Sequence, residues 1–413
     1  MTPAGVRSER PLTPSNIAPM SVYLDHAATT PLRPEVLEAM MPLLTTDYGN
    51  PSSVHGPGRK ARAALDEAHE RLAKGLNAQP REVIFTGGGS EAINLALKGV
   101  AWAGKGRGNR LITSAVEHHA VLHSLRHLEK FGFEIVVLPV DRYGRLDPEQ
   151  LDAAINDRTI LVSVMLANNE VGTIQPLADI VRRVRAHRGV AIHVDAIQAA
   201  PYLAIDVQEL DVDLLSIAAH KFEGPKGMGA LFVRHGTILL PQMHGGAQER
   251  YRRAGTENVA GAYGMAVAYE MARAEQPEVA PRLAALRDRL RDAVTALPSV
   301  ELTGHPRKRL PGHLSVIARD VDGEALILNL DLAGIAASTG SACTTGSTDP
   351  SHVLTALGYP EEETRGSLRL TLGRTTTAAE IDEAVTLVPQ TINRLRGATA
   401  ALADDPLGQQ VGA

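Results

Sequence analysis

The sequence predicts an α/β protein in which a large domain with a mostly parallel, seven-stranded sheet is joined to a smaller α+β domain. Short apolar runs alternate with helical stretches between residues 82 and 234, and such alternation is typical of a parallel sheet covered by helices on both faces. The chain has 413 residues, which exceeds the roughly 250–300 residues that one hydrophobic core usually supports.

The predicted strands of the large domain are Glu82–Thr86, Arg110–Ser114, Glu134–Val140, Ile160–Leu166, Ala191–Asp195, Leu214–Ala218 and Gly229–Val233. The helices expected between them are Ser90–Ala103, Ala120–Phe131 and Pro176–His187. About ten residues separate the last two strands, whereas a parallel crossover needs a dozen or more. We therefore expect the last strand to run antiparallel, on an edge of the sheet.

The pattern changes beyond Gly261. Apolar residues recur every three or four positions from Leu283 to Leu297, which predicts an amphipathic helix that Pro298 ends. The other elements expected in this smaller domain are two strands and a helix, at His313–Ile317, Ser367–Leu372 and Ala378–Arg396.

Net charge, the length of apolar runs and the number of cysteines indicate which classes of protein this sequence does not fit. The formal net charge is -5, which gives no support to binding of nucleic acid or an anionic membrane. No apolar run approaches the ~18 residues that span a bilayer, and residues 1–20 lack the apolar stretch of a secretion signal. A single cysteine cannot form an internal disulfide, so we expect a cytoplasmic protein.

That cysteine, Cys343, lies in the run Ser338–Ser347, which is small, polar and rich in glycine. A lone cysteine is most often a small buried hydrophobe, but such a run favours a loop over a core position. We therefore interpret Cys343 as an exposed, functional thiol.

Residues 86–91 (TGGGSE) link a predicted strand to a predicted helix. Glycines let backbone amides approach an anion, and the N-terminus of a helix favours negative charge. Gly89 and Ser90 are thus candidate phosphate ligands, with Ser90 also expected as the N-cap. An ordinary tight turn explains this motif about equally well.

Two further residues follow strands in the same region. Asp195 ends an apolar strand, at the edge where open α/β sheets bind ligands, although a helix N-cap is a common alternative there. Lys221 follows the next strand and is a candidate for a Schiff base. For Lys226 we prefer an exposed lysine.

His119, His123 and His127 recur at helical spacing and could form a metal face. No carboxylate or thiol lies at ligand spacing nearby, so we predict no metal. We expect His118 to lie at the end of a strand, facing the cleft.

A phosphate cradle, a carboxylate and a lysine at neighbouring strand ends together suit pyridoxal 5'-phosphate. The lysine would bind the aldehyde carbon, and the carboxylate would keep the pyridine nitrogen protonated.

The chain resembles the cysteine desulfurases (NifS/IscS-like) of the class V aminotransferase family, which have the pyridoxal-phosphate fold type I. The matching segments are Tyr23–Pro31, Gly49–Ser53, Asn168–Gly172, His193–Asp195, His220–Lys221, Arg253–Asn258, Ser338–Thr344 and Ser367–Arg374. The implied domains are a flexible leader (1–20), a large cofactor-binding domain (31–275), a small domain carrying the cysteine loop (21–30 and 276–397) and a flexible tail (398–413).

The resemblance implies a role for each matched residue. Lys221 would carry the cofactor, and Cys343 would be the nucleophile. His118 would stack on the cofactor ring and is a candidate catalytic acid/base. The other implied cofactor ligands are Asp195, Gln198, Asn169, Gly89, Ser90, His220 and, from a second subunit, Thr256. Arg369 would bind the substrate carboxylate with help from Asn50. Ala218 departs from the family, because a serine hydroxyl that would touch the phosphate is missing there.

The expected reaction removes sulfur from L-cysteine, leaving L-alanine and a persulfide on Cys343. A homodimer and a transient sulfur-acceptor protein, for iron–sulfur assembly or tRNA thiolation, are the implied partners. Alternatives are a selenocysteine lyase or another class V aminotransferase reaction, neither of which needs a thiol in a loop. A non-catalytic scaffold is disfavoured because Lys221, Asp195, Cys343 and Arg369 are all present.

Overall fold

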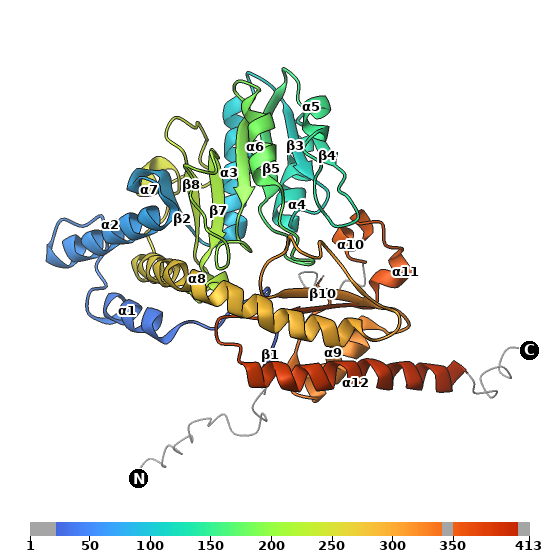
Figure 1. Cartoon of the computed structure of the whole chain (residues 1–413). Coiled ribbons are helices and arrows are strands. Elements are labelled where there is room, and N and C mark those ends of the chain that lie inside the picture. The colour runs from blue at the N-terminus through green and yellow to red at the C-terminus, as the bar shows by residue number, and fades with distance from the viewer. Residues whose placement is uncertain (1–21, 341–349, 404–413) are drawn as a thin grey trace, which may run out of the picture.

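The computed structural model describes residues 22–340 and 350–403. A seven-stranded sheet with helices on both faces stands above two long helices, α8 and α12, and a smaller sheet lies beside them (Figure 1). This confirms the predicted α/β class and the seven-stranded, mostly parallel sheet.

The large sheet places the carboxyl ends of its parallel strands along one edge. Its strands, in spatial order, are β2 (Val83–Thr86), β8 (Gly229–Val233), β7 (Leu214–Ala218), β6 (Ala191–Asp195), β5 (Thr159–Met165), β3 (Arg110–Ser114) and β4 (Glu134–Leu138). All neighbouring pairs are parallel except those of β8, which is antiparallel to both β2 and β7.

The antiparallel direction predicted for β8 is confirmed, but its expected place on an edge is wrong. β8 lies between β7 and β2, pairing Ala218 with Gly229 on one side and Thr86 with Gly229 on the other. The short connection brings β8 directly back beside β7. β2, the first strand of this sheet along the chain, then takes the outer position.

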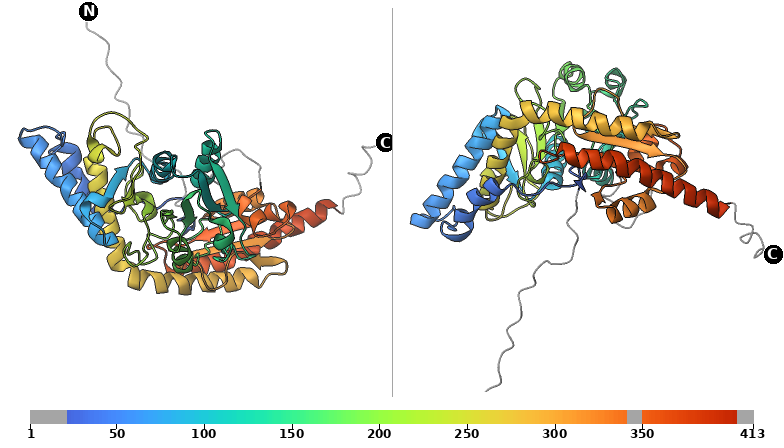
Figure 2. Two further views of the ribbon diagram at one scale, coloured as in Figure 1. Left: turned by 90° about the horizontal axis from the view of Figure 1, so that it is seen from above. Right: turned by 60° about the horizontal axis from the view of Figure 1, so that its bottom comes forward.

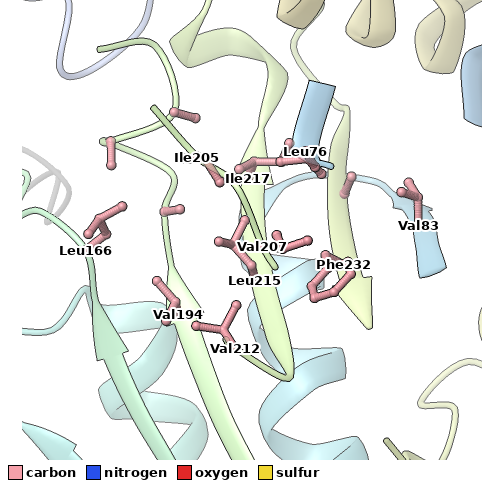
Figure 3. Close-up of a cluster of buried hydrophobic side chains, with 14 of the residues drawn as sticks. Leu76, Val83, Leu166, Val194, Ile205, Val207, Val212, Leu215, Ile217 and Phe232 are labelled. Atoms are coloured by element: carbon pink, nitrogen blue, oxygen red, sulfur yellow. The ribbon is translucent and has the colours of Figure 1, made fainter. Parts of the chain in front are cut away.

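Alternate residues of the strands pack on opposite faces of the sheet, as the two-residue period of a strand requires. Leu215 and Phe232 belong to the core beneath helices α2, α6 and α8, whereas Leu214 and Leu231 belong to the core beneath α3 and α4. Figure 3 shows part of the first core, where side chains of the central strands meet Leu76 of α2.

The helices and short 3-10 turns of this part are α1 (Pro34–Thr45), α2 (Gly56–Leu76), η1 (Pro80–Glu82), α3 (Gly89–Gly104), α4 (His119–Glu129), α5 (Gln150–Ala154), α6 (Leu177–Arg185), η2 (Ala219–Lys221) and α7 (Gln248–Tyr251). The helices expected at 90–103, 120–131 and 176–187 correspond to α3, α4 and α6.

A second hydrophobic core contains residues from near both ends of the described part of the chain. It packs around a three-stranded antiparallel sheet and a two-stranded parallel one. The elements that contribute to this core are β1 (Val22–Tyr23), β9 (Val300–Leu302), β10 (His313–Ala318), α9 (Gly323–Leu332), β11 (Ile335–Ala336), β12 (Ser367–Thr371) and α12 (Ala378–Ala403). Two short helices nearby are α10 (His352–Ala356) and α11 (Glu361–Thr364), and α10 packs in a separate small cluster with Met165. β1 pairs with β11, so the N-terminal segment is part of this core.

The helix predicted from Leu283 is much longer than expected. α8 runs without interruption from Val259 to Thr295 and contains Pro277 and Pro281. Its first part packs in the core of the large sheet and its last part in the second core, so it passes along both (Figure 2). The proposed domain boundary at residue 275 falls within this helix, and the division into domains stays a prediction.

The flexibility expected at the two ends of the chain stays a prediction. Residues 1–20 lie outside the described part of the chain. Residues 398–403 continue α12, and the rest of the expected tail lies outside the described part. Within residues 22–340 and 350–403, no helix is both long and apolar enough to cross a bilayer.

Two buried tyrosines should respond differently to removal of the hydroxyl group. The Tyr269 side chain is fully buried, and its hydroxyl has no hydrogen-bond partner among the described residues. The Tyr202 hydroxyl donates to the carbonyl of Leu372 at 3.2 Å. We expect Tyr269→Phe to leave the free energy of unfolding unchanged or raise it by up to about 1 kcal/mol, and Tyr202→Phe to lower it by about 1 kcal/mol. Urea unfolding measures both, and a loss from Tyr269→Phe would contradict the assignment.

Candidate active site

A cavity of ≈ 270 Å³ opens at the carboxyl ends of the large sheet's strands. Nine of the residues predicted for the site line it: Gly89, Ser90, His118, Asn169, Asp195, Gln198, His220, Lys221 and Arg369. Residues from the seven-stranded sheet, the three-stranded sheet and the N-terminal segment therefore meet in one place, although they are spread over most of the chain.

Lys221 ends the 3-10 turn η2, directly after β7. Its Nζ donates hydrogen bonds to the carbonyl oxygens of Ala27, at 2.6 Å, and Ala28, at 2.8 Å. The amine is thus held at the cavity wall by backbone oxygens of the N-terminal segment. Lys226, by contrast, is exposed, as expected.

Asp195 is the last residue of β6 and is buried. Its Oδ1 accepts a hydrogen bond from the amide of Ile197 at 2.9 Å. Burial raises the pKa of Asp195 to about 6, while that hydrogen bond and Lys221 oppose the rise. No helix starts after Asp195, since the next element is β7, so the helix N-cap alternative is wrong. A cationic ligand would keep this buried carboxyl ionised.

The glycine-rich turn leads from β2 into α3. Gly88 has φ 147°, a conformation that L side chains rarely adopt. A Cβ on Gly89 would press against the side chain of Ile197, which would have to shift to make room for it. The N-cap of α3 is Gly88, so the expectation that Ser90 is the N-cap is wrong. Ser90 is instead exposed in the first helical turn, whose amides have no partners within the helix.

Two histidines flank the cavity in neutral form. His118 is the N-cap of α4, and its Nδ1 accepts from the amide of Ala120 at 3.0 Å. Burial and the nearby Lys221 lower the pKa of His118 to about 4, and the same causes lower the pKa of His220 to about 4. Because Nδ1 of His118 accepts, the proton of its neutral ring lies on Nε2.

Arg369 is buried in β12. Its Nη2 lies 2.9 Å from Oδ1 of Asp25, and its Nη1 donates to the carbonyls of Asn169 at 3.0 Å and Gly340 at 3.3 Å. The guanidinium is thereby fixed at the cavity wall. Gln198 donates to the carbonyl of Ala27 at 2.9 Å.

Two predicted residues that the structure describes, Thr256 and Asn50, do not line this cavity. Thr256 lines a different cavity of ≈ 220 Å³, and Asn50 is exposed with its Oδ1 accepting from the amide of Ser52. Their roles stay predictions. Cys343 lies outside the described residues.

The structure adds residues to which the sequence assigned no role. Asp25, Ala27 and Ala28 contact Lys221, Gln198 or Arg369 and belong to the matched segment Tyr23–Pro31, so the motif itself was the available signal. Glu117 is the other addition. It is fully buried beside His118, and its Oε1 accepts from Ser114 at 2.6 Å and from the amide of Met165 at 3.0 Å.

His119 stacks with His123 and contacts the ring of His352, with ring centroids 4.9 and 4.5 Å apart. His127 instead packs against Phe131. Within the part of the chain that the structure describes, no three metal-ligating side chains are grouped to hold an ion.

The burial of Glu117 predicts that replacing it with glutamine stabilises the fold in a pH-dependent way. Burial raises the pKa of Glu117 to about 8, so the unfolded chain releases this proton near the ordinary pKa of about 4.3 and the folded chain does not. Stability is therefore lost as the pH rises from about 4.3 to about 8. Glu117→Gln should raise the free energy of unfolding of cofactor-free protein by up to a few kcal/mol at pH 8, with no gain at pH 4. The exposed Glu209→Gln is the control, and an equal gain at both pH values would contradict the prediction.

Comparison with known proteins places this geometry in a family. The "Aminotransferase class-V" family model matches residues 22–384. Cysteine desulfurase IscS of Methanosarcina thermophila is 48% identical over 376 residues, covering 91% of this chain and 93% of that protein. Cysteine desulfurase IscS of Dictyoglomus turgidum is 49% identical over 376 residues, covering 91% and 95%.

Solved structures agree with these relatives. A NifS-like protein superposes with a TM-score of 0.86 at 37% identity, covering 91% of this chain and 100% of that one. The structure of SspA in complex with cysteine superposes with a TM-score of 0.77 at 34% identity, covering 86% and 100%. The chain therefore belongs to the class-V aminotransferase family.

Proposed function

We propose that the protein is a pyridoxal-phosphate-dependent cysteine desulfurase. The observation that carries the proposal is the convergence of Lys221, Asp195, Arg369 and the N-terminal turn of α3 on one cavity. The curated relatives are named for this activity.

The donor set of the cavity fits the cofactor. The buried carboxyl of Asp195 suits a protonated ring nitrogen, and the first turn of α3 with Gly89, Ser90 and His220 suits a phosphate. His118 would lie against the ring, with Asn169 and Gln198 beside it. When bound, pyridoxal phosphate supplies an electron sink that acidifies the proton at the α-carbon of the amino acid. Ala218 offers no hydroxyl, so the phosphate would depend on the remaining donors.

Arg369 would bind the carboxylate of L-cysteine. A planar guanidinium can bind a carboxylate through two parallel hydrogen bonds, which fixes the orientation of the substrate. The existing contacts with Asp25, Asn169 and Gly340 keep the guanidinium in place before substrate arrives. The amine of Lys221 would then remove the proton from the α-carbon.

Cys343 would accept the sulfur. Its thiolate attacks the sulfur atom of the substrate, a new S–S bond forms and the C–S bond of the substrate breaks. The carbon takes up a proton and leaves as L-alanine, and Cys343 carries the persulfide. A sulfur-acceptor protein, serving iron–sulfur assembly or tRNA thiolation, would receive that sulfur, and the single cysteine suits a cytoplasmic setting.

A homodimer is supported by the distribution of exposed apolar side chains. Among the described residues, large exposed hydrophobics concentrate in two stretches. They are Leu32, Leu37, Met41, Leu44, Tyr48 and Val54 in and around α1, and Ile238, Leu240, Met243 and Tyr251 before and in α7. Exposed apolar patches of this kind favour contact with another protein surface. Asn50 and Thr256 lie in or near these stretches, which agrees with a role across a subunit interface.

Chemical trapping tests the proposal directly. Borohydride reduction of the purified protein with pyridoxal phosphate should attach the cofactor to Lys221, identified by peptide mass spectrometry. Incubation with L-cysteine should add one sulfur atom to Cys343 and release L-alanine. Cys343→Ser should keep cofactor binding and lose both products. Label on another side chain, or normal turnover by Cys343→Ser, would overturn the proposal.

Substitution of the carboxylate ligand tests substrate binding. Arg369→Lys keeps the charge but loses the two parallel hydrogen bonds. We expect kcat/KM for L-cysteine to fall about 10- to 100-fold, mainly through KM, because a carboxylate held by one donor is poorly oriented. Borohydride labelling of Lys221 should stay at the wild-type level. An unchanged KM would assign the substrate carboxylate to another residue.

A further inference from the structure

Glu223 is a buried carboxylate two residues after Lys221. Its residue is 6% exposed, and its backbone has φ 61°, in the left-handed region that few residues other than glycine adopt. Backbone strain of this kind persists only where the surroundings fix it, and it is common at functional sites.

Three hydrogen bonds from two other segments of the chain hold Glu223. Its Oε2 accepts from Nε of Arg374 at 2.6 Å, its amide donates to Oγ1 of Thr30 at 2.8 Å, and its carbonyl accepts from the amide of Arg33 at 3.0 Å. The side chain thus reaches the end of β12, and the backbone is joined to the N-terminal segment. The short loop from Lys221 to Glu223 has an anchor at each end, because Lys221 is itself bonded to Ala27 and Ala28.

Arg374 follows the strand that carries Arg369. The turn between them packs closely against the ring of His26, because a Cβ added to Gly373 would overlap with that ring. Arg282 of α8 donates to the carbonyls of Arg374 and Thr376, which fixes the backbone of the turn. The position of Arg374 is therefore set by the second core and not by the loop of Lys221.

A second ion pair lies beside the first. Arg33 makes two hydrogen bonds with Glu275, at 2.6 and 2.9 Å, and Glu275 lies 3.7 Å from Nε of Arg374. These side chains and Lys221 line a second, separate cavity of ≈ 40 Å³. Glu275 has the same charge as Glu223 but belongs to α8, so it offers a matched control.

We propose that Glu223 and Arg374 are a positioning pair that holds the loop of Lys221 at a fixed distance from β12, the strand that carries Arg369. Through this ion pair, the second core sets where the lysine amine lies relative to the bound carboxylate of an amino acid. The inference rests on the proposed function, because it assigns Lys221 and Arg369 to the cofactor and the substrate.

The test measures how fast the full chain, freed of cofactor, attaches added pyridoxal phosphate to Lys221, followed by absorbance and by borohydride labelling. We expect Glu223→Gly and Arg374→Gln each to slow attachment about tenfold, since a displaced amine attacks from the wrong geometry. The double variant should be no slower than the slower single one, because both changes break the same contact. Arg374→Lys keeps a cation and should lie between Arg374→Gln and the wild type, whereas Glu275→Gln should stay within about threefold of the wild type.

The Glu223→Gly variant distinguishes a role of Glu223 in positioning Lys221 from a role in the stability of the loop alone. Glycine adopts the left-handed conformation without strain, so a structural role predicts an unchanged or faster reaction. Glu223→Gln, which keeps the side-chain size, gives the second measurement if the unfolding midpoint of Glu223→Gly falls. Wild-type rates in both Glu223 variants, or single effects that multiply in the double variant, would overturn the inference. A wild-type protein that never labels Lys221 would instead overturn the proposed function itself.

Discussion

The site depends on one N-terminal segment, which offers hydrogen-bond acceptors to both Lys221 and Arg369. Lys221 is half-buried and Arg369 is buried, and they come from different sheets. A charge withdrawn from water is costly unless it is paired or hydrogen-bonded. The segment from Asp25 to Thr30 meets this need for both, through the carbonyls of Ala27 and Ala28 and the carboxylate of Asp25. The same segment bonds to His220 through the amide of Thr30. The N-terminal part of the chain is therefore built into the site, even though most of the site follows the strands of the large sheet.

The sheet supplies the rest of the arrangement. Parallel strands present their carboxyl ends at one edge, so Asp195 after β6 and Lys221 after β7 become neighbours without any special loop. Gly89 lets the turn before α3 approach the same edge closely. These three positions were predictable from sequence because each follows from a local pattern, namely an apolar strand followed by a polar residue or by glycines.

The features that the sequence did not predict depend on distant contacts. The insertion of β8 between β7 and β2 is a matter of strand pairing, which leaves no mark in the local pattern. The continuity of α8 was missed because proline usually ends a helix, and here Pro277 and Pro281 lie inside one. Asp25 is separated from Arg369 by 344 positions, so no spacing could have suggested their contact. The burial of Glu117 also depends on a distant contact, because its carboxylate accepts a hydrogen bond from the amide of Met165 in β5.

α8 also constrains how the molecule can move. Its first turns are packed in one core and its last turns in the other, so a rotation of one core against the other would require this helix to bend. Pro277 and Pro281 each lack an amide donor, and helices bend most readily at proline. Any hinge between the two halves would therefore cost least in the stretch from Pro277 to Pro281, directly after Glu275.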